Sequence, residues 1–362
     1  MRNRRQFIKN ISLASTGSLY LSMATLSATT LLSGCSTVDD YLITNPSDLG
    51  NQVAIIGGGI TGLYAAYQLK KRKIPYRIFE LSSRLGGKIM SDQNLEYGAF
   101  EFSNQDKNLL ALAKDLNLKT EKTDSKNWVF KNGTSDFLSQ LIDRIGGVLP
   151  DQKIKLNNRL IGLDKNSHQF RLTFSTLKSD KTYTANQVLL AVPWAQLKTL
   201  QGVNPPDRLS FKTQTIRSVR VVFFHEKPDL KINIKKYKSF AQLGLNCEVR
   251  THQGMVYVTL FGDAEGPEFP QEIEQISLWI AENIFDVSAG SLDIKPENIY
   301  IWTTAYVVDD KNYDEAMISR PIVISDGYTV GDLTKNILSD TLNQHRIENL
   351  LISVNKKIDQ FL

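Results

Sequence analysis

Hydrophobic residues form two kinds of pattern along this chain. Residues 53–56 and 188–192 are unbroken apolar runs, of the length that buried parallel strands have. Residues 108–116 and 137–145 space their apolar side chains three and four positions apart, which predicts one-sided helices, and the glycines at 146–147 end the second helix. Apolar runs mixed with helical patterns are typical of an α/β protein.

Strand patterns become more frequent in the second half of the chain. Alternating polar and apolar residues predict a meander, formed by residues 153–163, 170–174 and 183–184. Longer strands are expected at 218–224, 255–261 and 299–308. Isoleucines at 273, 276, 280 and 284 mark one face of a helix, which we interpret as core packing.

A glycine-rich turn directly follows the first apolar run. Gly57, Gly59 and Gly62 have the spacing that makes a tight turn, lets the backbone approach a pyrophosphate and lets the next helix pack closely. Glu80 closes the next predicted strand, eighteen residues after Gly62, and its carboxylate suits a ribose diol. Because a buried strand, a glycine turn and an acidic residue at the end of the next strand occur in this order, the sequence predicts a bound dinucleotide.

The residues after Glu80 indicate which dinucleotide is bound. Arg84, Gly86, Gly87 and Lys88 resemble the Arg-x-Gly-Gly-Arg signature of the flavin-containing amine oxidase family, with lysine in the last position. The resemblance implies FAD, with the arginine near its phosphates and the glycines under its ring system. It also implies the fold: α/β, with a Rossmann-like FAD-binding domain of two- or three-layer ββα type and an interleaved α+β substrate domain.

Other segments extend the resemblance over residues 51–362. Residues 95–100 resemble the family's strand beside the flavin, although its acid is displaced or missing here. Residues 185–193 resemble the strand that returns to the FAD sheet, and residues 347–353 resemble the last helix, in which family glycines are replaced. The implied cofactor contacts are Gly57, Gly58, Gly59, Ile60, Thr61, Gly62, Glu80, Arg84, Gly86, Gly87, Lys88, Gly98, Ala99, Leu160, Asp326 and Ile347.

The N-terminal segment has the features of an export signal. Arg4 and Arg5 lie in a stretch that resembles a twin-arginine motif, and residues 32–35 resemble a bacterial lipobox. We therefore expect a signal at residues 1–34, a lipid on Cys35 and a tether at 35–50. The mature chain would lie on the periplasmic side of a bacterial membrane, anchored by its lipid. A retained membrane anchor is the alternative.

The resemblance implies a division of the remaining chain. We expect the FAD-binding domain at residues 51–100, 141–195 and 318–362 and the substrate domain at residues 101–140 and 196–317.

Charge and cysteine content narrow the possible partners. The full chain carries a net charge of +5, but residues 1–34 hold four basic residues and no acid, which leaves 39 basic and 38 acidic residues. This balance gives no electrostatic reason to expect nucleic acid binding. With Cys35 lipidated, Cys247 has no partner for an internal disulfide, and the strand around it does not resemble the family's covalent flavin site, so we expect noncovalent FAD. Four scattered histidines show no metal-ligand spacing.

The resemblance implies an FAD-dependent oxidoreductase. Enzymes of this class transfer a hydride from a small or amphipathic substrate, such as an amine, to flavin N5 and then reduce oxygen or a quinone-type acceptor. Arg217 and Arg220 lie where the family places a lysine near N5, and they are the candidate catalytic residues, with exposed strand positions as the alternative. Trp302, Tyr306 and Tyr313 would supply aromatic walls, or would pack between the lobes instead.

Two other functions stay open. The family's cage tyrosine corresponds to His345 or Arg346, and the last helix lacks the family's glycines. These departures favour either a desaturase- or renalase-like oxidase of a non-amine substrate or a degenerate flavin-binding scaffold without turnover. The sequence does not determine the oligomeric state.

Overall fold

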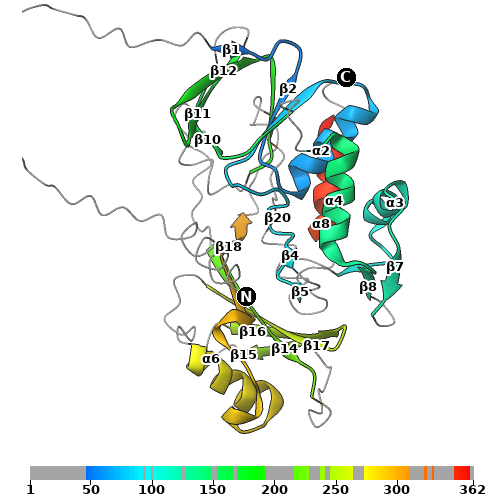
Figure 1. Ribbon diagram of the computed structural model, residues 1–362, viewed down its shortest axis with the longest axis vertical. Helices are drawn as coiled ribbons and strands as arrows, with labels where there is room; N and C mark the ends of the chain where they lie inside the picture. Colours follow the sequence, from blue (N-terminus) through cyan, green and yellow to red (C-terminus); the bar gives the residue numbers. More distant parts are fainter. Residues whose placement is uncertain are drawn as a thin grey trace, which may run out of the picture. The chain divides into compact units, whose positions relative to one another are not determined.

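The computed structural model describes residues 46–92, 95–98, 101–123, 127–147, 153–165, 169–192, 216–227, 237–240, 245–263, 273–309, 322–323, 328–329 and 346–358. They belong to one compact unit, Asn45–Leu362. Within it, sheets of five, four and six strands carry most of the structure (Figure 1).

The five-stranded sheet is parallel throughout, in the order β19–β13–β2–β3–β9. Its strands are β2 (Val53–Ile56), β3 (Tyr76–Phe79), β9 (Ile154–Lys155), β13 (Gln187–Leu190) and β19 (Ile322–Val323). All of β2 is buried because both faces of this sheet are covered, which explains its unbroken apolar sequence. Helix α2 (Ile60–Lys71) connects β2 to β3, so the predicted first βαβ unit is confirmed.

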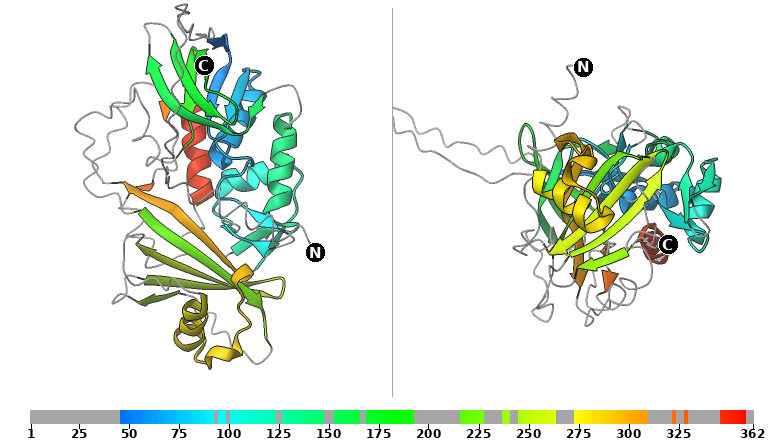
Figure 2. Two further views of the ribbon diagram at one scale, coloured as in Figure 1. Left: turned by 60° about the vertical axis from the view of Figure 1, so that its left-hand side comes forward. Right: turned by 90° about the horizontal axis from the view of Figure 1, so that it is seen from below.

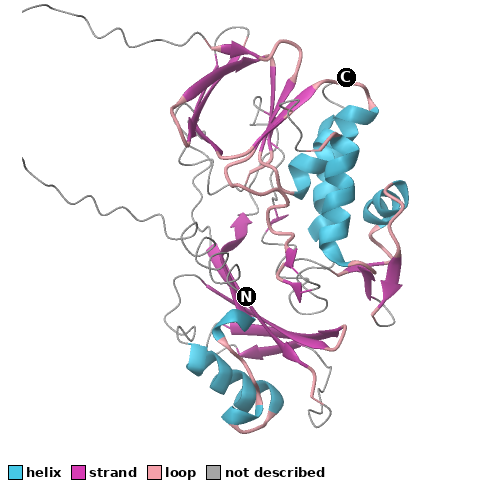
Figure 3. Cartoon of the chain, viewed as in Figure 1, coloured by secondary structure: helices cyan, strands magenta, loops and turns pink. Residues whose placement is uncertain are grey.

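Helices cover one face of this sheet. Helix α2 packs between α4 (Gly133–Ile145) and α8 (Arg346–Ile358), and α3 (Lys107–Asp115) packs on α8 (Figure 3). The one-sided helices predicted at 108–116 and 137–145 are therefore confirmed as α3 and α4.

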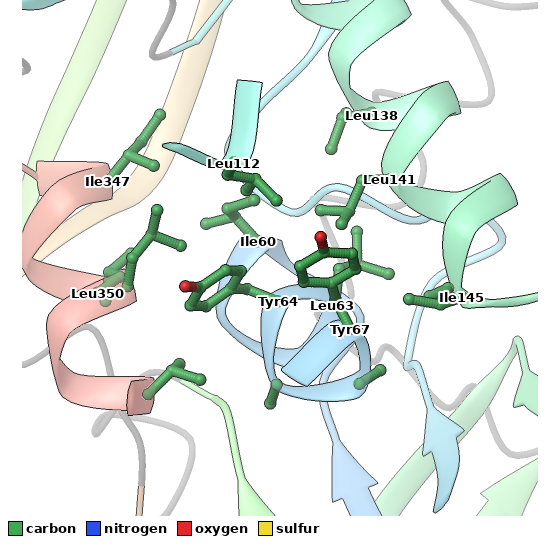
Figure 4. Packing of buried hydrophobic residues seen from close by; sticks show 14 of the residues in the cluster. Ile60, Leu63, Tyr64, Tyr67, Leu112, Leu138, Leu141, Ile145, Ile347 and Leu350 are labelled. Atoms are coloured by element: carbon green, nitrogen blue, oxygen red, sulfur yellow. The ribbon is translucent and has the colours of Figure 1, made fainter. Parts of the chain in front are cut away.

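The side chains between these helices form the largest core cluster. Figure 4 shows Ile347 and Leu350 of α8 on one side of Tyr64, while Leu141 and Ile145 of α4 approach α2 from the other side. All five are buried. Burying one such side chain stabilises the fold by about 1.5–3 kcal/mol, so the contacts of the C-terminal helix matter for this half of the protein.

A four-stranded sheet covers the opposite face of the parallel sheet. Its order is β1 (Ser47–Asp48), β12 (Lys181–Ala185), β11 (Phe170–Thr176) and β10 (Asn158–Lys165). The residues of β2 alternate between the two cores: Val53 and Ile55 join the helical cluster, and Ala54 and Ile56 join the cluster under the four-stranded sheet. The parallel sheet is thus the middle of three layers.

The six-stranded sheet forms the second half of the protein. Its order is β15 (Tyr237–Phe240), β16 (Leu245–His252), β17 (Met255–Asp263), β14 (Ile216–His225), β18 (Ile299–Asp309) and β20 (Tyr328–Thr329). Helix α6 (Ile273–Ile280) and the π-helical turn η2 (Ala281–Phe285) cover one face, as Figure 2 shows. The predicted strands at 218–224, 255–261 and 299–308 are confirmed.

Smaller elements complete the fold. A hairpin of β4 (Ser91–Asp92) and β5 (Leu95–Glu96) follows β3, and β6 (Phe102–Ser103), β8 (Asn127–Phe130) and β7 (Thr120–Lys122) form a three-stranded sheet. Two 3₁₀ turns, η3 (Ala289–Ser291) and η4 (Pro296–Asn298), precede β18.

Three sequence predictions need correction. Helix α4 begins at Gly133 rather than at 137, so the expected domain boundary at 140/141 falls inside it. The strand expected at 153–163 is two strands in different sheets, because Asn157 adopts a left-handed conformation with φ 57°. The end of the segment expected to be a tether, residues 35–50, overlaps the fold, since Ser47–Asp48 pairs with β12 and Leu49 is buried.

Candidate functional site

The glycine turn lies at the carboxyl ends of β2 and β3. A Cβ atom on Gly62 would lie 1.9 Å from the carbonyl oxygen of Gly57, and one on Gly57, whose φ is +107°, would lie 2.4 Å from that of Ala191. Both glycines are therefore required by the fold itself. At Gly59 the nearest atom to an added Cβ would be Gly87 Cα, at 3.8 Å, so the space in front of this residue is open.

Glu80 is fixed beside this turn. Its Oε2 accepts a hydrogen bond from the Gly58 N–H at 2.6 Å, and its Oε1 accepts from the N–H and hydroxyl of Ser82 at 2.8 and 2.7 Å. These contacts hold the carboxylate at the end of β3, where a ribose hydroxyl would be expected.

The loop that contains Arg84 closes over the glycine turn. Gly86 donates its N–H to the Gly58 carbonyl at 2.8 Å, and Gly59 and Gly86 form a parallel bridge. Arg84 Nη2 donates to the Gly87 carbonyl at 2.7 Å, so its guanidinium is held against its own loop. Positive φ angles at Gly86 and Gly87 make this loop possible.

These residues fit a dinucleotide pyrophosphate. Helix α2 begins after Gly59 with no side-chain cap and no acidic residue in its first turn, so its first N–H groups and the positive end of its dipole are available to an anion. Gly59 leaves open the space that a side chain would fill, and Arg84 lies in the loop beside it. FAD would be held by Gly57–Gly62, Glu80 and the loop 84–88.

Two buried carboxylates support the helices around this site, and sequence reasoning missed both roles. Glu96 accepts hydrogen bonds from the Thr134 N–H at 2.8 Å and hydroxyl at 2.5 Å, and so caps α4. Burial raises the pKa of Glu96, and the bonds from Thr134 oppose that rise. Glu96 stands two residues before Gly98, where the family's acid was described as displaced or missing, and this corrects that interpretation.

Glu348 performs the same task for α3. Its Oε1 accepts from the N–H and Nδ2–H of Asn108 at 3.0 and 2.6 Å, and its Oε2 accepts from the Leu109 N–H at 2.9 Å. The carboxylate is nearly buried, with 6% of the residue exposed. The last helix therefore completes the first turn of α3, a long-range contact that no local pattern reveals.

Three aromatic side chains lie together between the residue before Gly98 and the six-stranded sheet. The ring of Tyr97 lies 5.4 Å from that of Phe223 and 5.3 Å from that of Tyr300, measured between centroids. Burial raises the pKa of Tyr300, and the charge of nearby Arg84 opposes the rise. Tyr97 follows Glu96 directly in the sequence, and this adjacency to the Gly98 motif is the signal that could have identified it.

A buried ionic cluster lies on β16. Arg250 Nη2 lies 2.8 Å from Glu248 Oε2, and Arg250 Nη1 lies 3.5 Å from Glu101 Oε2. At most 5% of each of the three side chains is exposed. The cluster joins the six-stranded sheet to the segment that follows Gly98.

The structure brings most predicted cofactor residues together. Ile60 and Thr61 begin α2 and are buried. Gly98 passes close to the Lys88 carbonyl, since an added Cβ would lie 2.0 Å from that oxygen. Leu160 and Ile347 have buried side chains in two different core clusters, so a cofactor contact from either would come from its backbone.

The side chains of other predicted residues lie outside the described part of the structure. Arg217 and Arg220 lie on β14, paired with β17 and β18, and their side chains are outside the described part of the structure, as are those of Trp302 and Tyr306. Cys35, Ala99, Tyr313, Asp326 and His345 also lie outside the described residues. The roles assigned to all of these residues stay predictions.

Three findings concern only the residues that the structure describes. None of their helices is long and apolar enough to cross a membrane. Among these residues, no group of three or more His, Cys, Asp or Glu side chains could hold a metal ion. Cys247, within the same described ranges, is buried and does not take part in a disulfide.

Comparison with protein families gives two matches. Residues 55–116 match the NAD(P)-binding Rossmann-like domain, and residues 98–224 match the flavin containing amine oxidoreductase family. The two matches overlap over residues 98–116, and the first covers the glycine turn, Glu80 and the loop of Arg84.

Curated relatives resemble a limited part of the chain. Protoporphyrinogen oxidase 2 of Arabidopsis thaliana is 34% identical over 92 residues, which are 23% of this chain and 18% of that protein. Coproporphyrinogen III oxidase of Staphylococcus aureus is 39% identical over 87 residues, 22% of this chain and 19% of that protein. The chain thus matches less than a fifth of the length of either relative.

Solved structures resemble the fold over most of the chain. Putrescine oxidase, as a triple mutant made to redesign cofactor binding, matches with a TM-score of 0.63 at 13% identity, over 87% of this chain and 99% of that one. A putative protoporphyrinogen oxidase from Exiguobacterium matches with a TM-score of 0.58 at 14% identity, over 86% and 98%. The predicted fold class is confirmed, and the comparisons imply FAD as the cofactor and support an FAD-dependent oxidoreductase.

Proposed function

We propose that this protein is an exported, lipid-anchored oxidoreductase that uses noncovalent FAD to oxidise a small amine, with oxygen or a quinone-type compound as the electron acceptor. One observation carries the cofactor assignment: the cradle in which Glu80 is fixed beside an open Gly59, with the Arg84 loop bridged to the same glycine. The match to the flavin containing amine oxidoreductase family supports the reaction class.

Each described group has a defined task in this proposal. FAD, when bound, supplies the acceptor for the hydride equivalent that leaves the substrate carbon. Glu80 holds the ribose, the N–H groups at the start of α2 hold the pyrophosphate, and Arg84 adds a positive charge beside it. Glu96 and Glu348 keep α4 and α3 in place behind the cofactor loops through the hydrogen bonds that they accept.

The aromatic side chains suit the role of excluding water near the reacting carbon. Tyr97, Phe223 and Tyr300 form a contiguous cluster that spans the cofactor loop and the six-stranded sheet. Aromatic walls exclude water and so favour the neutral form of an amine over its charged form. A neutral amine transfers a hydride without a dedicated acid–base group.

The proposed substrate is an amine rather than a porphyrinogen. Curated relatives include oxidases of porphyrinogens, and a solved relative is a putrescine oxidase. We choose an amine because the matching family is that of the flavin containing amine oxidoreductases.

The location at a membrane is part of the proposal. Its support is the twin-arginine-like stretch and the lipobox at residues 32–35. A protein that must load FAD in the cytoplasm before export suits a route that moves folded proteins. Mass analysis of the N-terminal peptide would reveal acyl groups on Cys35, and an unmodified Cys35 in membrane-purified protein would refute the anchor.

Anaerobic reduction of the bound flavin tests the function. The purified protein should show flavin absorption bands that pass into the filtrate after denaturation. Putrescine, other diamines and monoamines should bleach these bands, and coproporphyrinogen III should not. Bleaching by the porphyrinogen alone would assign the non-amine alternative, and flavin that no donor bleaches would favour a scaffold without turnover. A colourless protein that does not take up FAD would refute the cofactor assignment.

A further inference from the structure

The turn between β11 and β12 exposes an apolar side chain between basic ones. Leu177 is 84% exposed, the largest exposed fraction among the large hydrophobic residues that the structure describes. Lys178 follows it, and Lys181 begins β12. Thr176 shapes the turn, since its Oγ donates to the Ser179 carbonyl at 2.6 Å and accepts from the Lys178 N–H at 3.3 Å.

The chain enters the fold beside this turn. Strand β1 pairs in parallel with β12, with Ser47 opposite Tyr183 and Asp48 opposite Thr184 (Figure 1). The start of β1 is therefore level with Tyr183, two residues after β12 leaves the turn. Ten residues, 36–45, separate Cys35 from the first described residue. Ten residues span at most about 35 Å when extended and about 18 Å as a flexible coil.

Basic residues continue from this turn along the edge of the parallel sheet. Burial lowers the pKa of Lys155, and the charges of Arg77 and Lys181 add to this effect. Arg77 also lines a cavity of about 280 Å³ with Lys70, Lys73 and Lys153, at the point where β2, β3 and β9 begin.

Two acidic residues, Asp180 and Asp48, lie in the turn and in β1 among the residues that the structure describes. The Oδ1 of Asp48 accepts hydrogen bonds from the Gly50 N–H and the Thr184 hydroxyl. None of the residues that line the cavity is acidic. We call Leu177, Lys178, Lys181, Lys155 and Arg77 the basic edge.

We propose that the basic edge docks on the anionic lipid surface to which Cys35 is anchored. Leu177 enters the headgroup layer, and the lysines pair with lipid phosphates while their apolar stems lie along the surface. The argument rests on the proposed lipid anchor, because a short tether that ends at β1 presents this edge to the bilayer first.

Fluorescence quenching by lipids tests the orientation. Since Asn45–Leu362 forms one compact unit, a histidine tag can replace residues 1–35 and hold the protein on nickel-chelating vesicles that contain phosphatidylglycerol. A bimane label on Ser179→Cys should be quenched several-fold more by headgroup nitroxide lipids than a label on Leu278→Cys, an exposed position on α6. Equal quenching at the two positions would overturn the proposal. The tag replaces the natural anchor, so this experiment does not depend on lipidation of Cys35. A failure of docking can therefore be told apart from a failure of the proposed lipid anchor.

Charge removal tests the lipid contact independently. At about 1 kcal/mol for each lysine near an anionic surface, Lys178→Gln with Lys181→Gln should weaken binding of the untagged residues 36–362 to phosphatidylglycerol vesicles about thirtyfold. The control, Lys114→Gln with Lys119→Gln, changes the net charge equally at exposed positions on and after α3. Equal weakening by both pairs would show that net charge alone governs binding and would refute docking through this edge.

Discussion

Replacing Gly59 by alanine should separate the folding of the protein from its binding of FAD. Gly59 has φ −72° and ψ −179°, an extended conformation open to every residue, and the new methyl group would meet its nearest neighbour at 3.8 Å. The lower entropy of the unfolded chain favours alanine by about 0.4–1 kcal/mol. Loss of glycine at the helix N-cap opposes this by a similar amount, so the free energy of unfolding of the apoprotein should change by less than about 1 kcal/mol.

The same methyl group should obstruct the cofactor. It would occupy the open space in front of the glycine turn, and overpacking of this kind costs about 1–3 kcal/mol, which corresponds to a five- to 150-fold weaker affinity for FAD. Gly62→Ala is the contrasting variant, because its Cβ would lie 1.9 Å from the Gly57 carbonyl oxygen and should destabilise the apoprotein.

Two measurements on the apoprotein decide the outcome. Chemical unfolding gives the stability of each variant, and titration with FAD, followed by flavin fluorescence, gives the affinity. Unchanged FAD affinity in Gly59→Ala would show that no pyrophosphate passes in front of this residue. A loss of apoprotein stability as large as that of Gly62→Ala would refute the structural reasoning.

Three further changes should affect stability. Glu348→Ala leaves two N–H groups at the start of α3 without their acceptor, and we expect urea unfolding to show a loss of about 2–5 kcal/mol, against no measurable loss for the exposed control Glu282→Ala. Arg250→Ala leaves Glu248 and Glu101 buried without their shared cation and should lower the free energy of unfolding by about 3–5 kcal/mol. Adding Glu248→Gln should recover part of that loss, and additive losses from the two substitutions would contradict an interaction between Arg250 and Glu248. Burial lowers the pKa of His252 below 6.5, against a smaller opposing effect of Glu121. The unfolded chain therefore binds this proton more readily, and the free energy of unfolding should fall as pH falls below 6.5. His252→Gln should flatten this part of the pH profile, and an unchanged profile would exclude His252 as the cause.

Local patterns predicted the elements whose environment is uniform. Strand β2 is buried on both faces and is apolar at every position, and the glycine turn is recognisable because steric limits at Gly57 and Gly62 leave no other residue possible. The predicted strands of the six-stranded sheet were confirmed for the related reason that one face of each packs against a single layer.

Contacts between distant residues account for most of what the sequence did not reveal. The early start of α4 depends on the carboxylate of Glu96, and the first turn of α3 depends on Glu348, 240 positions away from Asn108. Nothing in the local sequence of either helix identifies its partner. The break at Asn157 was likewise missed, because the two flanking strands pair with partners in different sheets, which come from distant parts of the chain. The aromatic cluster at Tyr97 was missed because Phe223 and Tyr300 come from strands far along the chain.

The position of α8 in the chain determines when the helical layer is completed during synthesis. The parallel sheet begins with β2 but receives β13 and β19 much later, and α8 then covers α2 and caps α3 with Glu348. The N-terminal half therefore has an exposed helical face until α8 has left the ribosome. The segment expected to direct export emerges long before α8, which completes the helical layer. Transport before synthesis ends would carry an open core across the membrane, and transport afterwards would carry a closed one.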